Sequence, residues 1–244
     1  LRDIDYDSWK PISTNQKAYF DLEKCNSCGK CYRTCYFDAI KFENNKPELK
    51  QFSCEGCGAC ELVCAKDAIT LVNVDNAKIG YAKTKYDFKV VSAQLGIGES
   101  GSGKVVSAVK ELGDKLSENS DFMLIDAAAG IGCPVIASVT GSDYVIAITE
   151  PTPSGFSDLK RALKMVNHFK IPKSVIINKY DINLDFSKKI EKYLIENNLK
   201  LTSKIKYDKS FSDALMNLVP VIEQNEEFLN VFQKIYVDLS KEIF

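Results

Sequence analysis

The stretch that decides the fold is a run of four cysteines, Cys25-Asn-Ser-Cys28-Gly-Lys-Cys31-Tyr-Arg-Thr-Cys35. A second run, Cys54-Glu-Gly-Cys57-Gly-Ala-Cys60-Glu-Leu-Val-Cys64, repeats every cysteine at one constant offset, so that Cys25 corresponds to Cys54 and Cys35 to Cys64. The tripeptide Asp38-Ala39-Ile40 returns at the same offset as Asp67-Ala68-Ile69. An offset that holds through so many landmarks indicates a duplicated unit.

Each copy has the spacing C-x2-C-x2-C-x3-C, which is typical of [4Fe–4S] ligation. Three thiolates on a tightly wound loop reach three irons of one cluster, and Gly29 and Gly58 allow the loop its unusual dihedral angles. The fourth cysteine of such a run ligates the other cluster in two-cluster ferredoxins, which this pattern resembles. We therefore expect one cluster on Cys25, Cys28, Cys31 and Cys64, and the other on Cys35, Cys54, Cys57 and Cys60. Such a pair carries electrons one at a time.

Two other uses of the cysteines fit less well. Zinc sites pair C-x2-C knuckles about 15–20 residues apart and do not pack four thiolates into one short run. A disulfide framework is typical of secreted proteins, and the sequence has no sign of that context. Tyr36 and Ala65 stand where bacterial ferredoxins usually have a proline, but that proline is not a ligand.

Composition narrows the class of protein further. The 244 residues include 32 Lys and Arg against 33 Asp and Glu, a net charge of −1, without a clustered basic stripe. This balance excludes an ordinary nucleic-acid-binding protein. No apolar run approaches the ~20 residues of a membrane helix, and no secretory leader is visible. We expect a cytoplasmic protein that does not bind membranes, and the lone His168 excludes a three-histidine metal site.

After about Tyr81 the pattern changes to short apolar strands that alternate with amphipathic helices, which predicts an α/β fold with a parallel sheet. The expected strands are Phe88–Leu95, Phe122–Asp126, Tyr144–Thr149, Ser174–Asn178 and Leu201–Ile205. The expected helices are Gly103–Ser117, Pro134–Val139, Ser157–Phe169 and Phe186–Asn197. The C-terminal segment Glu226–Phe244 is an acidic amphipathic stretch that we expect to pack against the domain rather than on a membrane.

Ligands of parallel α/β sheets bind at the carboxyl ends of the strands, and two of these ends are polar. Asp126 closes an apolar strand, as an aspartate that holds Mg²⁺ beside a nucleotide would, although a helix-capping aspartate has the same appearance. Asn178, Lys179 and Asp181 follow the next but one strand, in an N-K-x-D arrangement that can present an amide and a carboxylate to a nucleobase. An ordinary polar turn explains that spacing equally well.

A glycine-rich segment, Gly98-Glu-Ser-Gly-Ser-Gly-Lys104, lies between a strand and a helix. It satisfies G-x4-G-K, the pattern of a phosphate-binding loop, with Lys104 as the phosphate ligand. Val105, however, stands where Ser or Thr must offer a hydroxyl to Mg²⁺. A structural turn that opens a helix is therefore the favoured interpretation, and Lys104 is the weakest of the candidate ligands.

Several segments together resemble one family. The segment Asp126-Ala-Ala-Ala-Gly-Ile-Gly-Cys-Pro-Val-Ile-Ala-Ser138 is similar to the switch segment of MinD/ParA-like P-loop ATPases, as are residues 149–161 and 177–183 to other parts of them. With the cysteine runs, the chain resembles MinD-like ATPases that carry an inserted ferredoxin domain. The resemblance implies a connector at 1–18, a two-[4Fe–4S] ferredoxin domain at 19–75 and an ATPase domain at 76–244. It also implies that Asp126 handles Mg²⁺ and that Asn178 lies at the adenine.

The nucleotide P-loop of that family lies before the ferredoxin insert, on the first strand and helix. The short stretch that precedes Cys25 contains nothing that resembles that loop. We therefore expect this α/β domain to be N-terminally incomplete. ATP and Mg²⁺ are then cofactors only if an upstream segment or a partner supplies the loop.

Three functions follow as hypotheses. The first is an iron–sulfur protein of the MinD-like ATPase family, which couples nucleotide binding and hydrolysis to electron transfer or to cluster delivery. Its partner would be a redox protein or an iron–sulfur acceptor, and the family suggests a homodimer. The second is a ferredoxin-type electron carrier with a non-hydrolysing, ATPase-like docking domain, and the third is a redox-sensing switch protein. Cys133, outside both runs, is expected to be a small buried thiol.

Overall fold

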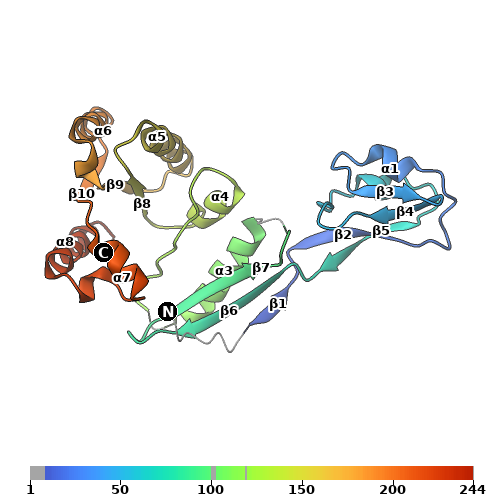
Figure 1. The fold of residues 1–244 in the computed structure, drawn as a ribbon, viewed down its shortest axis with the longest axis horizontal. Coiled ribbons are helices and arrows are strands. Elements are labelled where there is room, and N and C mark those ends of the chain that lie inside the picture. The colour runs from blue at the N-terminus through green and yellow to red at the C-terminus, as the bar shows by residue number, and fades with distance from the viewer. Residues whose placement is uncertain (1–8, 100–102, 119, 244) are drawn as a thin grey trace. The chain divides into compact units, whose positions relative to one another are not determined.

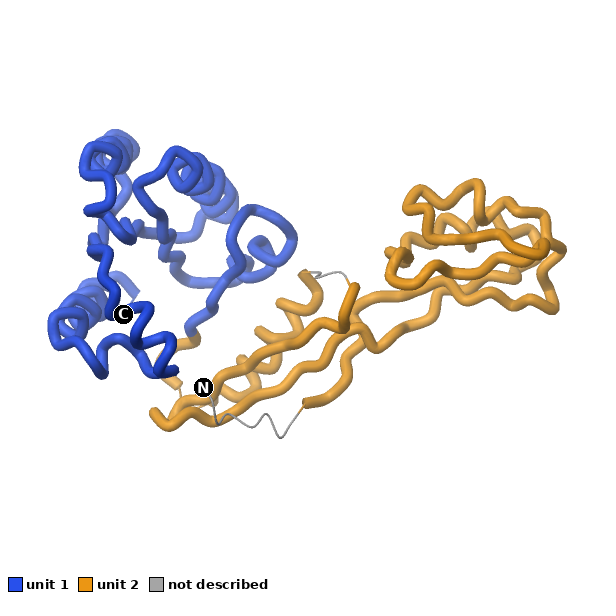
Figure 2. Tube along the Cα trace, viewed as in Figure 1, with its two compact units in different colours: residues 1–4, 124–244 blue, residues 5–123 orange. Residues whose placement is uncertain are grey.

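A computed structural model describes residues 9–99, 103–118 and 120–243. The chain divides into two compact units between Met123 and Leu124 (Figure 2). The expected domain boundary lies earlier, at 75/76, so the structure groups residues 76–123 with the cysteine-rich part of the chain. In the part of the chain described, no helix has the length and apolarity needed to cross a membrane.

The cysteine-rich part belongs to the unit that ends at Met123, orange in Figure 2, and is built from two antiparallel strand pairs and two short helices (Figure 1). Strand β2 (Asn15–Phe20) pairs with β5 (Ile69–Val74), and β3 (Ile40–Glu43) pairs with β4 (Lys46–Leu49). The helices are α1 (Lys30–Thr34) and α2 (Ala59–Leu62), one from each copy of the repeat. Their cysteines Cys31 and Cys60 are buried in one core with Ala18, Ile40 and Ile69. Both copies of the repeat therefore share a single small core.

The rest of this unit is a three-stranded antiparallel sheet with a helix beside it. Its strands are β1 (Lys10–Ile12), β6 (Ala77–Lys83) and β7 (Lys89–Leu95), in the order β1-β6-β7, and its helix is α3 (Gly103–Leu116). The expected strand at Phe88–Leu95 exists as β7, but its assignment to the parallel sheet is wrong, because β7 pairs antiparallel with β6. The turn that joins them is short, with the Thr84 N–H donating to the Phe88 carbonyl. A connection this short joins only antiparallel neighbours.

The unit that contains residues 124–243, blue in Figure 2, is a parallel sheet covered by helices. Strands β8 (Val145–Thr149), β9 (Lys173–Asn178) and β10 (Lys200–Ile205) lie in the order β10-β9-β8. The helices are α4 (Cys133–Val139), α5 (Pro153–His168), α6 (Leu184–Glu196), α7 (Ser210–Met216) and α8 (Glu226–Ile243), with single 3₁₀ turns at Tyr180–Ile182 and Val221–Glu223. The mixed α/β class and the parallel sheet are confirmed. Strands β8, β9 and β10 and helices α4, α5 and α6 match expected elements to within about four residues, whereas α7 and the two 3₁₀ turns were not expected.

The central strand β9 explains why helices lie on both faces of the sheet. Val175 and Ile177 are fully buried in one core with residues of α5 and α6. Ile176, between them, is buried in a second core with Phe228 and Ile235 of α8. Alternate side chains of a strand point to opposite faces, so an unbroken apolar run requires cover on both. Helix α8 therefore packs against the sheet, as expected for the C-terminal stretch.

One expected strand is absent. The segment Phe122–Asp126 has no regular secondary structure and pairs with no strand among the described residues. Its side chains Phe122 and Leu124 are 56% and 80% exposed. The segment also crosses the division between the two units. An apolar stretch becomes a strand only where a neighbour pairs with its backbone, and this one lacks such a neighbour.

Candidate iron-sulfur centres and a candidate nucleotide site

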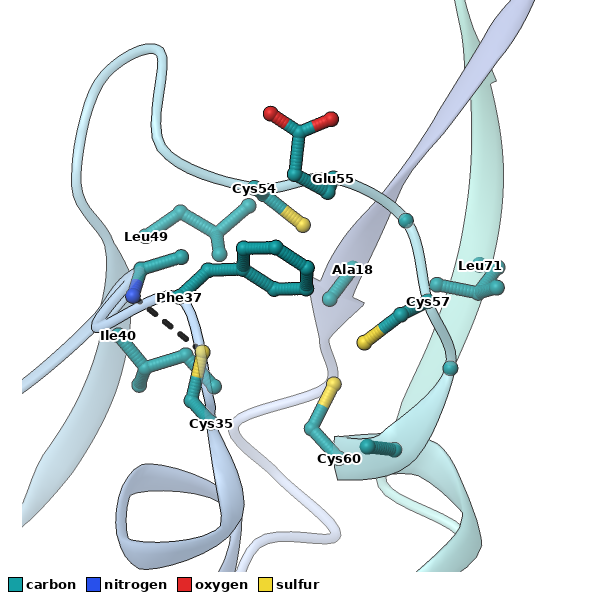
Figure 3. Close-up of a pocket in the computed structure, with 14 residues that line it drawn as sticks. Ala18, Cys35, Phe37, Ile40, Leu49, Cys54, Glu55, Cys57, Cys60 and Leu71 are labelled. Atoms are coloured by element: carbon teal, nitrogen blue, oxygen red, sulfur yellow. Dashed lines mark hydrogen bonds between the residues drawn. The ribbon is translucent and has the colours of Figure 1, made fainter.

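Two pockets in the cysteine-rich part are each lined by four cysteines. The first, here the Cys35 pocket, is lined by Cys35, Cys54, Cys57 and Cys60. Figure 3 shows their sulfurs converging on one space, with Phe37, Ile40, Leu49 and Leu71 around it. Three of the cysteines come from the second run and one from the first.

The second pocket, here the Cys25 pocket, is lined by Cys25, Cys28, Cys31 and Cys64. Its apolar lining comes from Phe20, Phe42, Pro47, Ala68 and Ile69. The structure thus brings together the two sets of four that the spacing predicts, with the fourth cysteine of each run in the other run's pocket. The empty volumes, mouths included, are about 350 and about 370 Å³, which suits two copies of the same group.

The repeated backbone geometry explains why the short motifs recur. Gly29 and Gly58 both adopt left-handed conformations, with φ of 69° and 77°, where each loop enters its helix. Asp38 and Asp67 are also left-handed, with φ of 48° and 47°. This turn lets the next residue, Ala39 or Ala68, donate its N–H to the sulfur of the fourth cysteine, at 3.3 Å in both copies. The repeated Asp-Ala-Ile therefore forms a sulfur-binding turn as well as a buried strand start.

The thiols have the chemistry that an iron–sulfur cluster requires. Burial raises the pKa of the Cys60 thiol to about 11, and it raises the pKa of Cys31 as well. Both thiols are therefore protonated at neutral pH without metal, and cluster binding must displace those protons. All-thiol donors in an apolar setting are the soft ligands that iron–sulfur clusters require.

Each pocket also has one charged residue in its lining that the cysteine motifs did not predict. Lys66 lines the Cys25 pocket, and Glu55 lines the Cys35 pocket. Glu55 lies inside the second cysteine run and Lys66 lies two residues after it. An alignment of the two copies of the repeat could have found both residues, because the matching positions, Asn26 and Phe37, are uncharged.

The carboxyl ends of the parallel strands gather a second group of polar residues. Lys179, directly after β9, forms an ion pair of 2.7 Å with Glu150, directly after β8. Asp181 accepts a 2.7 Å hydrogen bond from the Tyr207 backbone N–H, beyond β10. Asn178 is half-buried at the end of β9, and its side-chain oxygen accepts the Lys179 N–H. These contacts tie three strand ends together, and sequence analysis missed Glu150 and Tyr207 because the pairs are far apart in the chain.

The other proposed nucleotide ligands are not part of these strand ends. Asp126 is exposed in the irregular segment described above. Lys104 is exposed in the first turn of α3, which belongs to the other unit, and residues 100–102 of its glycine-rich loop lie outside the described residues. The expectation that Cys133 is buried is wrong: Cys133 is exposed as the first residue of α4, whereas Val135 and Val139 are the residues that enter the core.

Comparison with known proteins agrees with the cysteine geometry. Residues 17–65 match the family described as "4Fe-4S dicluster domain". The chain is 33% identical over 137 residues to the uncharacterized protein MJ0579 of Methanocaldococcus jannaschii, a match that covers 53% of the chain and 50% of that relative. It is 24% identical over 130 residues to the uncharacterized ATP-binding protein MJ0685 of the same organism, covering 52% of the chain and 50% of that relative. The chain thus spans about half the length of these two relatives.

A third relative is similar along almost the whole chain. The uncharacterized protein MJ0578 of M. jannaschii is 31% identical over 227 residues, which is 93% of the chain and 75% of the relative. The chain is therefore an iron–sulfur protein with a 4Fe-4S dicluster domain, and it belongs to the same family as MJ0578.

Proposed function

We propose that this protein transfers electrons through two [4Fe–4S] clusters and that a MinD/ParA-like ATPase domain controls the transfer. The observation that carries the first part is the pair of pockets, each lined by four thiols, within one small core. Cys25, Cys28, Cys31 and Cys64 would hold one cluster, and Cys35, Cys54, Cys57 and Cys60 the other. A bound cluster would supply a one-electron carrier, and the apolar side chains of the pocket walls would shield part of it from water.

The second part rests on the strand ends of the parallel sheet. Ligands of such sheets bind at these ends, where Asn178, Lys179 and Asp181 lie. Asn178 and Asp181 would recognise the nucleobase, Asp126 would handle Mg²⁺, and the phosphates would need a loop from an upstream segment or a partner. The similarity to MJ0685, which is described as an ATP-binding protein, supports a nucleotide as the ligand. The clusters would then pass electrons, or be delivered, to a redox partner or an acceptor protein when a nucleotide changes the state of a homodimer.

A second candidate function is an electron carrier whose ATPase-like domain only docks a partner. Two of the proposed base-binding side chains are already engaged, Lys179 with Glu150 and Asp181 with Tyr207. The segment that ends at Asp126 is not a strand, so that aspartate is not held at a strand end. These contacts favour a strand-end surface that is held together internally.

The test uses the chain loaded with clusters under anaerobic conditions. An EPR-monitored redox titration, with and without Mg-ATP, measures reversible one-electron reduction and any nucleotide-dependent shift. Calorimetry with Mg-ATP then compares the chain with N178A and with N167A, an exposed asparagine of α5 that serves as the control. Reversible reduction together with ATP binding that N178A alone weakens supports the first function.

The other outcomes separate the two candidates. Reversible reduction without ATP binding, in the chain alone and in a mixture with a protein that carries a phosphate-binding loop, supports the docking function and contradicts ATPase control. Clusters that assemble but cannot be reduced reversibly contradict electron transfer in both forms.

A further inference from the structure

The two pockets have the same cysteine framework but opposite charge in their walls. Among the described residues that line them, the charged one is Lys66 in the Cys25 pocket and Glu55 in the Cys35 pocket. The internal repeat matches these positions one to one. At the offset that relates Cys25 to Cys54, Glu55 corresponds to Asn26 and Lys66 to Phe37, and Asn26 and Phe37 line the opposite pockets.

A second positive charge belongs to the Cys25 pocket. The Arg33 guanidinium Nη2 donates to the carbonyl of Cys28 at 2.9 Å, so the charge is held against the cluster-binding loop. The matching residue of the second copy is Leu62, which is 88% exposed and carries no charge. Arginine beside one loop and leucine beside the other therefore add to the asymmetry that Lys66 and Glu55 create.

The other nearby charges largely cancel. Lys24 is paired with Asp21 at 2.9 Å, and Lys50 with Asp38 at 2.5 Å. Asp67, in the left-handed turn that matches the turn of Asp38, adds a negative charge beside the Cys25 pocket, so that Lys66, Arg33 and Asp67 together leave one net positive charge there. Glu61, in the first turn of α2, adds a further negative charge to the helix that carries Cys60. The net difference between the two pockets is thus positive for the Cys25 pocket and negative for the Cys35 pocket.

We propose that these charges give the two clusters different reduction potentials, with the higher potential in the Cys25 pocket. Reduction adds one negative charge to a cluster, and Lys66 and Arg33 stabilise that charge, whereas Glu55 opposes it in the other pocket. Figure 3 shows the Glu55 carboxylate pointing away from the sulfurs, so it acts through space and not as a ligand. Lys66 and Glu55 are both exposed, so their effect is screened by salt.

The consequence is a direction for the proposed electron transfer, on which this inference rests. An electron on the cluster of the Cys35 pocket moves to the cluster of the Cys25 pocket. The first is oxidised by one electron, the second is reduced by one, and no proton is transferred. The Cys25 pocket is then the side from which an acceptor protein takes the electron.

The experiment is an EPR-monitored potentiometric titration of the full cluster-loaded chain. K66Q and E55Q each remove one charge, and K78Q, on strand β6 outside both pockets, is the matched control. We expect two one-electron steps in the unmodified chain, with at least about a tenfold preference for the electron in one cluster, or about 59 mV. K66Q should lower only the upper step and E55Q should raise only the lower step, each by about threefold, or roughly 28 mV, while K78Q moves neither.

Each alternative result has a definite meaning. Two coincident steps, a shift of the lower step by K66Q, or shifts equal to those of K78Q would overturn the potential order and leave electron transfer itself intact. Iron content, measured for every variant, shows whether a lost step reflects a lost cluster. Absence of reversible reduction in the unmodified chain would contradict the inference and the proposed function together. If the order is right, the gap between the steps narrows as the ionic strength rises.

Discussion

Gly56 lies so close to a neighbouring backbone that no larger residue fits at this position without a shift. It lies in the loop of the Cys35 pocket with φ of +65°, and a Cβ added there would come within 2.3 Å of the Gln16 carbonyl oxygen. Gln16 belongs to β2, which pairs with β5 along its whole length, so a shift of this backbone would disturb the hydrogen bonds between the two strands. We therefore expect Gly56→Ala to loosen the loop that carries Cys54 and Cys57.

The matched variant is Gly58→Ala, in the same loop. Gly58 has a similar φ of +77°, but its added Cβ would meet only side-chain atoms, the nearest being Leu71 at 3.6 Å. Both variants carry the left-handed penalty of about 1–2 kcal/mol. Gly56→Ala adds an overpacking cost of about 1–3 kcal/mol because its neighbour is backbone. In the first copy of the repeat, Ser27 occupies the position of Gly56 with φ of 59°. A side chain is therefore tolerated at this left-handed conformation, and the extra cost expected for Gly56→Ala comes from the contact with the Gln16 backbone.

The assay is capture of iron by a chelator from the cluster-loaded protein under anaerobic conditions. When the loop opens and closes faster than the chelator acts, the rate of capture follows the free energy of local opening. A difference of about 2 kcal/mol makes iron release from Gly56→Ala about 30-fold faster than from Gly58→Ala. Release affects about half of the iron, since only one pocket contains Gly56. Rates within threefold of each other would show that β2 yields, and the reasoning from backbone contact would be refuted.

Three further predictions follow from the same contacts. At pH 8, Cys60 in the cluster-free protein should react with iodoacetamide about tenfold more slowly than the thiol of an added short model peptide. The raised pKa of Cys60, about 11, leaves about a hundredfold less thiolate, and the greater nucleophilicity of that thiolate offsets the loss only in part. The difference in rate should shrink as the pH rises toward 11. Peptide mass spectrometry measures both rates, and equal rates at pH 8 would contradict the argument that burial raises this pKa. Asp181→Ala should lower the free energy of unfolding by about 1 kcal/mol, because the Tyr207 N–H loses its acceptor; urea unfolding followed by circular dichroism checks this, and no change would mean that water replaces the bond fully. Phe228→Ala should lower the free energy of unfolding by about 3–5 kcal/mol in the same assay, because Phe228 is only 1% exposed, on α8 where it packs against the sheet. A decrease below about 1 kcal/mol would show that the core around Ile176 and Phe228 is not formed as described.

Local patterns in the sequence were enough to predict the elements near them. The cysteine spacing, the Asp-Ala-Ile repeat and the glycines after the second cysteines act within a few bonds, so their geometry follows from the chain itself. The strands β8, β9 and β10 and the helices between them were found for a similar reason. Their apolar periodicity reports burial on the sheet, and each is delimited by its own turn residues.

Pairing between distant segments was decided only by the tertiary structure. The residues of β7 have the pattern of a strand whatever their partner, but antiparallel pairing with β6 removed them from the parallel sheet. Phe122–Asp126 has the composition of a strand and no neighbour to pair with among the described residues, so it forms none. The ion pair of Lys179 with Glu150 depends on which strand ends lie side by side, and no spacing encodes that. Residue type and spacing determine what a segment is able to do, while hydrogen-bond pairing and charge placement depend on which other segment folds against it.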